Sequence, residues 1–140
     1  MKSKFQPIIK LKEQTIEEIS AKIAEINQQI EKQIERIALH KTEYFKNHEP
    51  ESGSMHYFAQ KQLLHVAFKQ ELNSLEHELN YLYGQERQLQ QQLSDERLEL
   101  ERYNVLHQEI VQKTMEKAKK QESDFLDEIG STAFANRGLF

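Results

Sequence analysis

The fold of this chain is decided by residues 16–37, IEEISAKIAEINQQIEKQIERI. Seven isoleucines recur in this stretch at spacings of 3, 4, 3, 4, 4 and 3 residues: Ile16, Ile19, Ile23, Ile26, Ile30, Ile34 and Ile37. That spacing predicts an α-helix with one apolar stripe and an otherwise polar surface, as in a coiled-coil strand. Because such a helix has no core of its own, we expect it to bury the stripe against another helix.

The composition favours a helical protein over a compact globule. The 140 residues are enough for one domain, but only 37% are hydrophobic and 30% are charged. A disordered chain would not keep isoleucines in register. We therefore expect an all-α fold.

Several classes of function are disfavoured by what the sequence lacks. Without cysteine there are no disulfides, no thiolate catalysis and no cysteine-based zinc site. No run of 18 apolar residues occurs, so we expect no membrane insertion, and no apolar segment follows the basic N-terminus as a secretory signal would require. The net charge of −4 makes nucleic acid an unexpected partner.

Proline and glycine predict where the helices begin and end. Pro7 fits a first helical turn, and neither residue type recurs until a polar stretch around Pro50 and Gly53. After that stretch the only breaker before Gly130 is Gly84. We therefore predict a single coiled-coil domain over residues 1–140, with a helix at about 6–47, a loop at 48–54, a helix at about 55–129 and a tail at 130–140.

The second helix carries a stripe of its own, which is a strict heptad from Leu72 onward. Glu86, Glu96 and His107 fall on its seam positions. Two successive steps of four residues occur at Ile26–Ile30–Ile34 and at Leu64–Phe68–Leu72. If the chain folds back near residue 50 or 51, position 30 faces about position 71 and these irregularities oppose each other.

These patterns predict a long two-helix antiparallel coiled-coil hairpin with a longer second helix. In the same register, residue 7 faces about residue 94. The second helix then has no partner within the chain for some 30 residues, although this part contains apolar side chains. We expect this overhang to dock into another molecule.

The sequence offers no catalytic, cofactor-binding or metal-binding site. None of the six histidines makes the i, i+4 pair of a helical HExxH site, and there is no glycine-rich phosphate loop or GxSxG motif. A two-helix hairpin also lacks a cleft of ligand size. We therefore expect a non-enzymatic protein without cofactors.

Two surfaces are candidates for protein partners. Apolar residues near the predicted loop occupy several helix faces, which a two-stranded seam cannot all cover. The candidate patch consists of Phe58, Leu63, Leu64 and Ala67. Lysines dominate residues 1–12 and 113–120, so a basic end could meet an acidic partner.

The chain resembles the FliJ family of flagellar (type III) export proteins. The resemblance covers nearly all of the chain and rests on the predicted hairpin, the basic start and KKQESDFLDEI at residues 119–129. The opening KSKFQPIIKLK at residues 2–12 is similar to the divergent epsilonproteobacterial branch.

This resemblance implies a cytoplasmic adaptor, peripheral at the flagellar base. FliJ-like proteins bind the hexameric export ATPase ring, the membrane export gate and, in some members, export chaperones. The ring contact would fall on Lys4, Lys10, Lys12, Lys113, Lys117 and Lys120. For the gate contact, Leu64 and Ala67 match the family's surface, Gln60 stands where the family has an aromatic residue, and Phe58 is a possible substitute.

Two other readings stay open. The protein could be a structural coiled coil that self-associates weakly through its overhang. It could also be a holdase chaperone of the prefoldin kind, although that fold needs β-hairpins and the sequence shows no alternating strand pattern.

Overall fold

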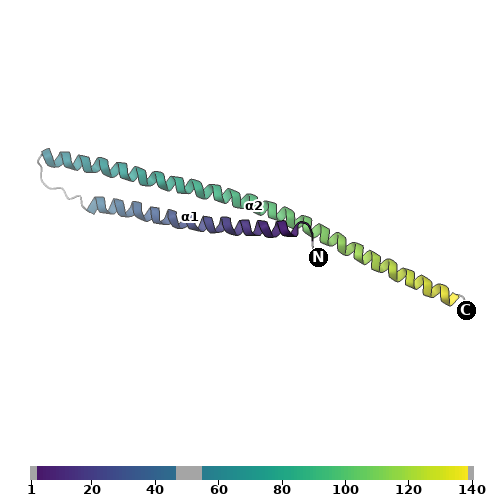
Figure 1. The fold of residues 1–140 in the computed structure, drawn as a ribbon. Coiled ribbons are helices and arrows are strands. Elements are labelled where there is room, and N and C mark those ends of the chain that lie inside the picture. Colours follow the sequence, from purple (N-terminus) through teal and green to yellow (C-terminus); the bar gives the residue numbers. More distant parts are fainter. Residues whose placement is uncertain (1–2, 47–54, 139–140) are drawn as a thin grey trace. The chain divides into compact units, whose positions relative to one another are not determined.

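The computed structural model describes residues 3–46 and 55–138, with side chains through residue 135. It contains two helices, α1 (Gln6–Lys46) and α2 (Met55–Gly138), and no strand within these residues (Figure 1). The prediction of an all-α fold with a longer second helix is therefore confirmed. The predicted loop at 48–54 lies outside the described residues.

The chain divides into two units, which are described separately. The hairpin unit is Ile16–Asp95 and the terminal unit is Met1–Thr15 with Glu96–Phe140. Each unit contains part of α1 and part of α2. Whether the chain forms a single domain stays a prediction.

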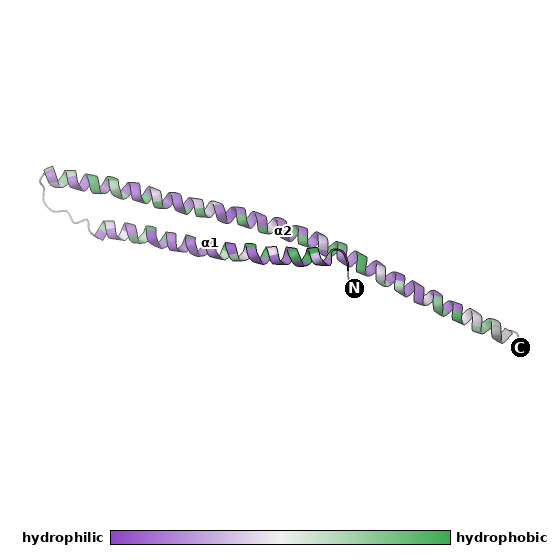
Figure 2. Ribbon diagram, viewed as in Figure 1, coloured by the Kyte–Doolittle hydropathy of each residue, from purple (hydrophilic) through white to green (hydrophobic). Residues whose placement is uncertain are grey.

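The core of the hairpin unit lies in the seam between α1 and α2, which run side by side there (Figure 1). Ile19, Ile23 and Leu93 form a buried cluster, and Ile16 and Leu89 pack against it. Figure 2 shows hydrophobic residues recurring along both helices among a larger number of hydrophilic ones. The burial confirms that the isoleucine stripe is covered by a second helix.

The seam of α1 follows a strict heptad, which differs from the predicted pattern at one position. The residues that face α2 include Ile30, Gln33 and Ile37, at steps of 3 and 4. Gln33 is 4% exposed, whereas Ile34 is 46% exposed. The prediction of two successive steps of four at Ile26–Ile30–Ile34 is therefore wrong, because Gln33 and not Ile34 occupies the seam position.

The seam of α2 also differs from the predicted pattern, since the expected irregular step at Leu64–Phe68–Leu72 is absent. His65 is half-buried, whereas Leu64 is 61% exposed, so the heptad runs without interruption from His65 through Phe68 and Leu72. Glu86 is half-buried on this seam, as the heptad predicted. Neither helix thus has the irregular step that the sequence predicted. The helices do pair, but the predicted match between two irregular steps is wrong.

The register of the hairpin unit differs from the prediction by about two helical turns. Gln33 contacts Leu75 and Glu78, so position 30 lies opposite residues near 79 and not near 71. The prediction placed the fold-back at the middle of the polar stretch. The observed register is instead set by which side chains fit together in the seam.

In the terminal unit, the residues just before α1 and its first turns pack against α2 as far as His107. Ile9 is buried, the rings of Phe5 and Tyr103 lie 5.8 Å apart, and Ser3 Oγ lies 2.5 Å from His107 Nδ1. Ser3 Oγ also accepts a hydrogen bond from the backbone N–H of Phe5. The partner of residue 7 is therefore near residue 102, and the predicted partner near residue 94 is wrong.

The helix α2 continues to Gly138, past its predicted end at residue 129. Gly130 does not adopt a positive φ, and the hydroxyl of Thr132 donates a hydrogen bond to the carbonyl of Glu128 across it. A glycine inside a helix costs about 1 kcal/mol relative to alanine, which by itself is not enough to end the helix. The tail predicted at 130–140 is therefore helical as far as residue 138.

No other helix covers the last part of α2 in the described portion of the terminal unit. Ile110 and Val111 are half-buried, and every residue from 112 to 135 is exposed. We call residues 112–135 the distal segment. The uncovered part of α2 thus begins at residue 112, and not just after residue 94 as the predicted register implied.

Candidate protein-binding surfaces

Gln33 occupies a buried seam position of the hairpin unit and is hydrogen-bonded there. Its side-chain Nε2 donates hydrogen bonds to the carbonyl of Leu75 at 3.0 Å and to Glu78 Oε2 at 3.1 Å. A buried amide without partners would be costly, and these two acceptors satisfy it in the observed register. The seam thus accommodates a polar residue at the expense of one apolar contact.

A stack of aromatic rings closes the seam near the end of α1. The ring of Phe68 lies 4.8 Å from that of His40 and 3.9 Å from that of Tyr44, nearly parallel to both. The hydroxyl of Tyr44 lies 2.8 Å from His65 Nδ1. This arrangement anchors the first described turns of α2 against the last turns of α1.

An open groove of about 360 Å³ lies beside this ring stack. Leu64 and Ala67 line it from α2, together with Phe68 and Glu71, and the facing side is formed by α1 residues that include Tyr44. Half of the predicted apolar patch thus borders a depression in the surface. Such a depression can receive an apolar side chain of another protein.

The predicted patch does not form one surface. Leu63 and Leu64 are 71% and 61% exposed, and they lie on the same side of α2 as Ala67. Phe58 is 62% exposed, but it precedes Ala67 by nine residues, which is two and a half helical turns, and so points to the opposite side. Gln60 shares the face of Leu64 and Ala67, so the helix puts a glutamine, and not Phe58, beside them.

In the terminal unit, Lys12 is held by two glutamates of α2. Its Nζ lies 2.8 Å from Glu96 Oε2 and also bonds Glu99. The hydrogen bonds that Lys12 donates to these two carboxylates raise the pKa of Lys12 above its ordinary value. The hydrogen bond from Lys12 in turn lowers the pKa of Glu99. The charge of Lys12 is therefore compensated within the chain.

This ion pair predicts a pH dependence of stability. Because the pKa of Glu99 is lower in the folded chain than its ordinary value of 4.5, its contribution is complete above pH 4.5 and is lost as the pH falls through the folded-state pKa. We expect Lys12→Met to lower the Tm at pH 7 by no more than a few degrees, since the pair is partly solvated. The difference between variant and native chain should shrink below pH 4.5, as followed by circular dichroism.

The contribution of the lysine in this ion pair depends on pH in the opposite direction. The raised pKa of Lys12 gives a contribution that is complete below its ordinary value of 10.5 and is lost only at higher pH. Lys10→Met is the matched control, because Lys10 is exposed and forms no ion pair with a described residue. A Tm difference for Lys12→Met that stays constant down to pH 3 would contradict this assignment.

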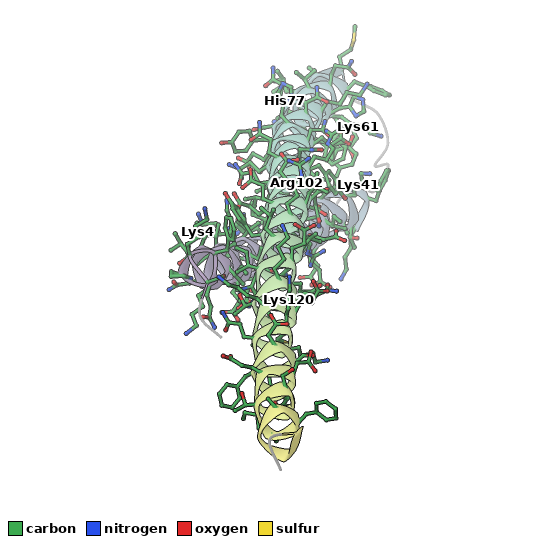
Figure 3. The ribbon with its side chains drawn as sticks, turned by 90° about the vertical axis from the view of Figure 1, so that its right-hand side faces the viewer. Lys4, Lys41, Lys61, His77, Arg102 and Lys120 are labelled. Carbon is green, nitrogen blue, oxygen red and sulfur yellow. The ribbon has the colours of Figure 1, made fainter. Side chains whose placement is uncertain are left out.

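The remaining lysines predicted as a partner surface are exposed. Lys4 lies 5.2 Å from the ring centre of Phe5, just before α1, and Lys113, Lys117 and Lys120 share one face of the distal segment. Figure 3 labels Lys4, which precedes α1, and Lys120 on α2. None of these four forms an ion pair within residues 3–46 and 55–138. Their charges are available to a partner.

The described residues contain neither a metal-binding group nor a membrane span. No group of three histidine, aspartate or glutamate side chains there is arranged to hold a metal ion. Neither helix contains a stretch long and apolar enough to span a bilayer.

The family model described as Flagellar FliJ protein matches residues 1–139. The chain belongs to the FliJ family. The FliJ resemblance inferred from the predicted hairpin and the sequence of residues 119–129 is thereby confirmed. FliJ membership gives the chain a part in flagellar protein export, in which the family has an accessory role and no known enzymatic activity. No curated protein matches the chain, and no solved structure does.

Three polar members of the seam were not predicted from the sequence of this FliJ-family chain. Gln33, His40 and His65 are hydrophilic, so a search for apolar stripes passes over them. Counting steps of 3 and 4 backward from Leu72 would have reached Phe68 and His65, and counting forward from Ile30 would have reached Gln33. The signal was the strict period and not the hydrophobicity.

Proposed function

We propose that this FliJ-family protein is a non-enzymatic adaptor that binds the export ATPase ring through its terminal unit. The observation that carries the proposal is the exposed distal segment. Residues 112–135 are uncovered, and they include five large apolar side chains: Met115, Phe125, Leu126, Ile129 and Phe134. A lone helix of this length is only marginally stable in water, so a partner that buries these residues would be favoured.

Charge supports the same surface. Lys113, Lys117 and Lys120 lie on one face of the distal segment, Lys10 is exposed on α1, and Lys4 is exposed just before that helix. Unpaired lysines attract an acidic surface and speed the encounter with it. Since Lys12 is already paired with glutamates, the proposed ring contact uses the other five lysines.

A second contact, with the export gate or with export chaperones, is proposed for the hairpin unit. Leu63, Leu64 and Ala67 are exposed on one side of α2, and the last two line the groove beside Tyr44 and Phe68. An apolar side chain entering this groove would be shielded from water by the ring stack. Phe58 is left out because it lies on the opposite side of the helix.

The proposed ring contact predicts the outcome of a truncation. A chain ending at Ile110 keeps all the described contacts between α1 and α2, so we expect its helical hairpin and its Tm to be retained. Co-purification of the export ATPase should fall at least tenfold because the uncovered apolar residues are gone.

The control for the truncation is a full-length chain with Leu63→Ala and Leu64→Ala, which should still bind the ATPase. Unchanged ATPase binding by the truncated chain would refute the proposed ring contact. Fractionation of cells, with the protein expected in the cytoplasm and partly at the flagellar base, tests the proposed location.

A holdase of the prefoldin kind is not favoured, because neither 3–46 nor 55–138 contains a strand. A purely structural role is less favoured than an adaptor because the family takes part in flagellar export.

A further inference from the structure

The apolar stripe of the distal segment does not continue the seam between α1 and α2. Extended beyond Ile110 in steps of 4 and 3, that seam would run through Thr114, Lys117, Gln121 and Asp124, all of which are polar. Met115, Phe125 and Ile129 instead lie one position later along the chain, whereas Leu126 and Phe134 lie off this line. The stripe at the shifted positions consists of Val111, which directly precedes the distal segment, and of Met115, Ala118, Phe125 and Ile129, with Glu122 as its one charged member.

A shift of one residue turns the stripe by about 100° around the helix axis. A helix that covered the distal stripe would therefore lie on a different side of α2 from α1. The stripe keeps the spacing of 4 and 3 from Val111 to Ile129, which is the spacing that one α-helix presents to another. It is thus a separate helix-binding face and not a continuation of the seam between α1 and α2.

We propose that the distal stripe pairs antiparallel with the same stripe of a second copy of this chain. In an antiparallel pair, each a position of one helix faces a d position of the other. The residue numbers of the two facing positions therefore add up to the same value in every layer. The layers are then Val111 with Ile129, Met115 with Phe125, and Ala118 with Glu122. Every apolar stripe residue meets a seam residue of the second copy, and the pair is symmetric.

Glu122 determines the orientation. In a parallel pair in register, the carboxylates of the two Glu122 side chains would face each other in the seam, and like charges so placed repel. In the antiparallel pair each Glu122 faces the small side chain of Ala118. It also comes close to Lys119 of the second copy, whose side chain flanks the stripe. The single charge in the stripe is therefore compensated in only one of the two orientations.

The pair leaves the lysine face free. Lys113 precedes Glu122 by nine residues, so it lies on the opposite side of α2, together with Lys117 and Lys120. The interface is short, so we expect a weak dimer that dissociates on dilution. Self-pairing does not depend on the proposed ATPase contact, although a partner that buries Phe125 would compete with it.

The absence of cysteine from the chain permits a direct test by cross-linking. The full-length variants Met115→Cys and Phe125→Cys are prepared separately, mixed, and oxidised at high protein concentration. The proposed layers place position 115 against position 125, within reach of a disulfide. Two copies of position 115 are ten residues apart along the antiparallel pair, or about 15 Å, which is too far.

We expect disulfide-linked dimers in the mixture and few in either variant alone. The pair Val111→Cys with Ile129→Cys should behave in the same way and does not remove an aromatic ring. Cross-links within each variant alone but not in the mixture would mean a parallel pair, and would overturn the proposal.

Sedimentation of the native chain across roughly a hundredfold range of concentration completes the test. A dimer that dissociates on dilution is expected. A monomer at every concentration, together with no cross-link in the mixture, would also overturn the proposal. Because no ATPase is present in these experiments, their failure would leave the proposed ring contact untouched.

Discussion

Ile30→Ala is expected to lower the free energy of unfolding by about 2–4 kcal/mol, whereas Ile34→Ala should lower it by less than about 1 kcal/mol. Both residues belong to the isoleucine repeat, and hydrophobicity alone cannot distinguish them. The structure does, because Ile30 is 7% exposed and Ile34 is 46% exposed. Removing the buried side chain leaves a cavity in the seam, and removing the exposed one does not.

Urea unfolding followed by circular dichroism measures both variants under the same conditions. The two substitutions have the same chemistry on the same helix, so helix propensity changes equally in each. Equal losses of stability, or a larger loss for Ile34→Ala, would mean that the seam passes through Ile34 and that Gln33 is not buried.

Phe68→Ala is expected to cost about 2–4 kcal/mol of stability, because this ring fills the space between His40 and Tyr44. Its loss removes two stacked contacts and leaves the end of α1 without its anchor on α2. Phe58→Ala is the matched control, with an expected cost below about 1 kcal/mol, since Phe58 is 62% exposed on the same helix.

The same unfolding experiment compares the two phenylalanine variants. Amide hydrogen exchange adds a local readout: in Phe68→Ala, exchange should accelerate in α1 near Tyr44 more than near Ile19. A Phe58→Ala variant that is destabilised as strongly as Phe68→Ala would contradict the observed order of side chains on α2.

The helices were predictable because the residues that start them and the spacing of their apolar residues are local features of the sequence. The start of α1 near Pro7 and the start of α2 at Met55 agree with the prediction within about one residue. The end of α2 was missed since Gly130 was taken as a stop. None of its neighbours Ile129, Ser131 and Thr132 is a helix breaker, and glycine alone imposes only a modest cost on helix stability.

The register was not predictable from residue counts. A fold-back point chosen at the middle of a polar stretch can be wrong by several residues, and each residue of error shifts the facing position by two. The actual register depends on pairs that only three-dimensional packing reveals, such as Gln33 with the carbonyl of Leu75 and Lys12 with Glu96. Hydrogen bonds of this kind leave no hydrophobic signal.

The candidate surfaces were predicted in part. Leu63, Leu64 and Ala67 are exposed on one side of α2, but the nine-residue separation from Phe58 splits the patch. Five of the six lysines are exposed, and Lys12 has partners that counting charges could not identify. The partner contacts themselves stay predictions.

Both proposals for the terminal unit depend on the distal segment being uncovered in the isolated chain. Amide hydrogen exchange on the dilute monomer tests this claim most directly. We predict slow exchange along α1 and in α2 from about Phe68 to His107, and fast exchange within two helical turns after Val111. Protection of residues 112–135 as strong as that of the hairpin unit would contradict the account, because this segment would then be covered without any partner.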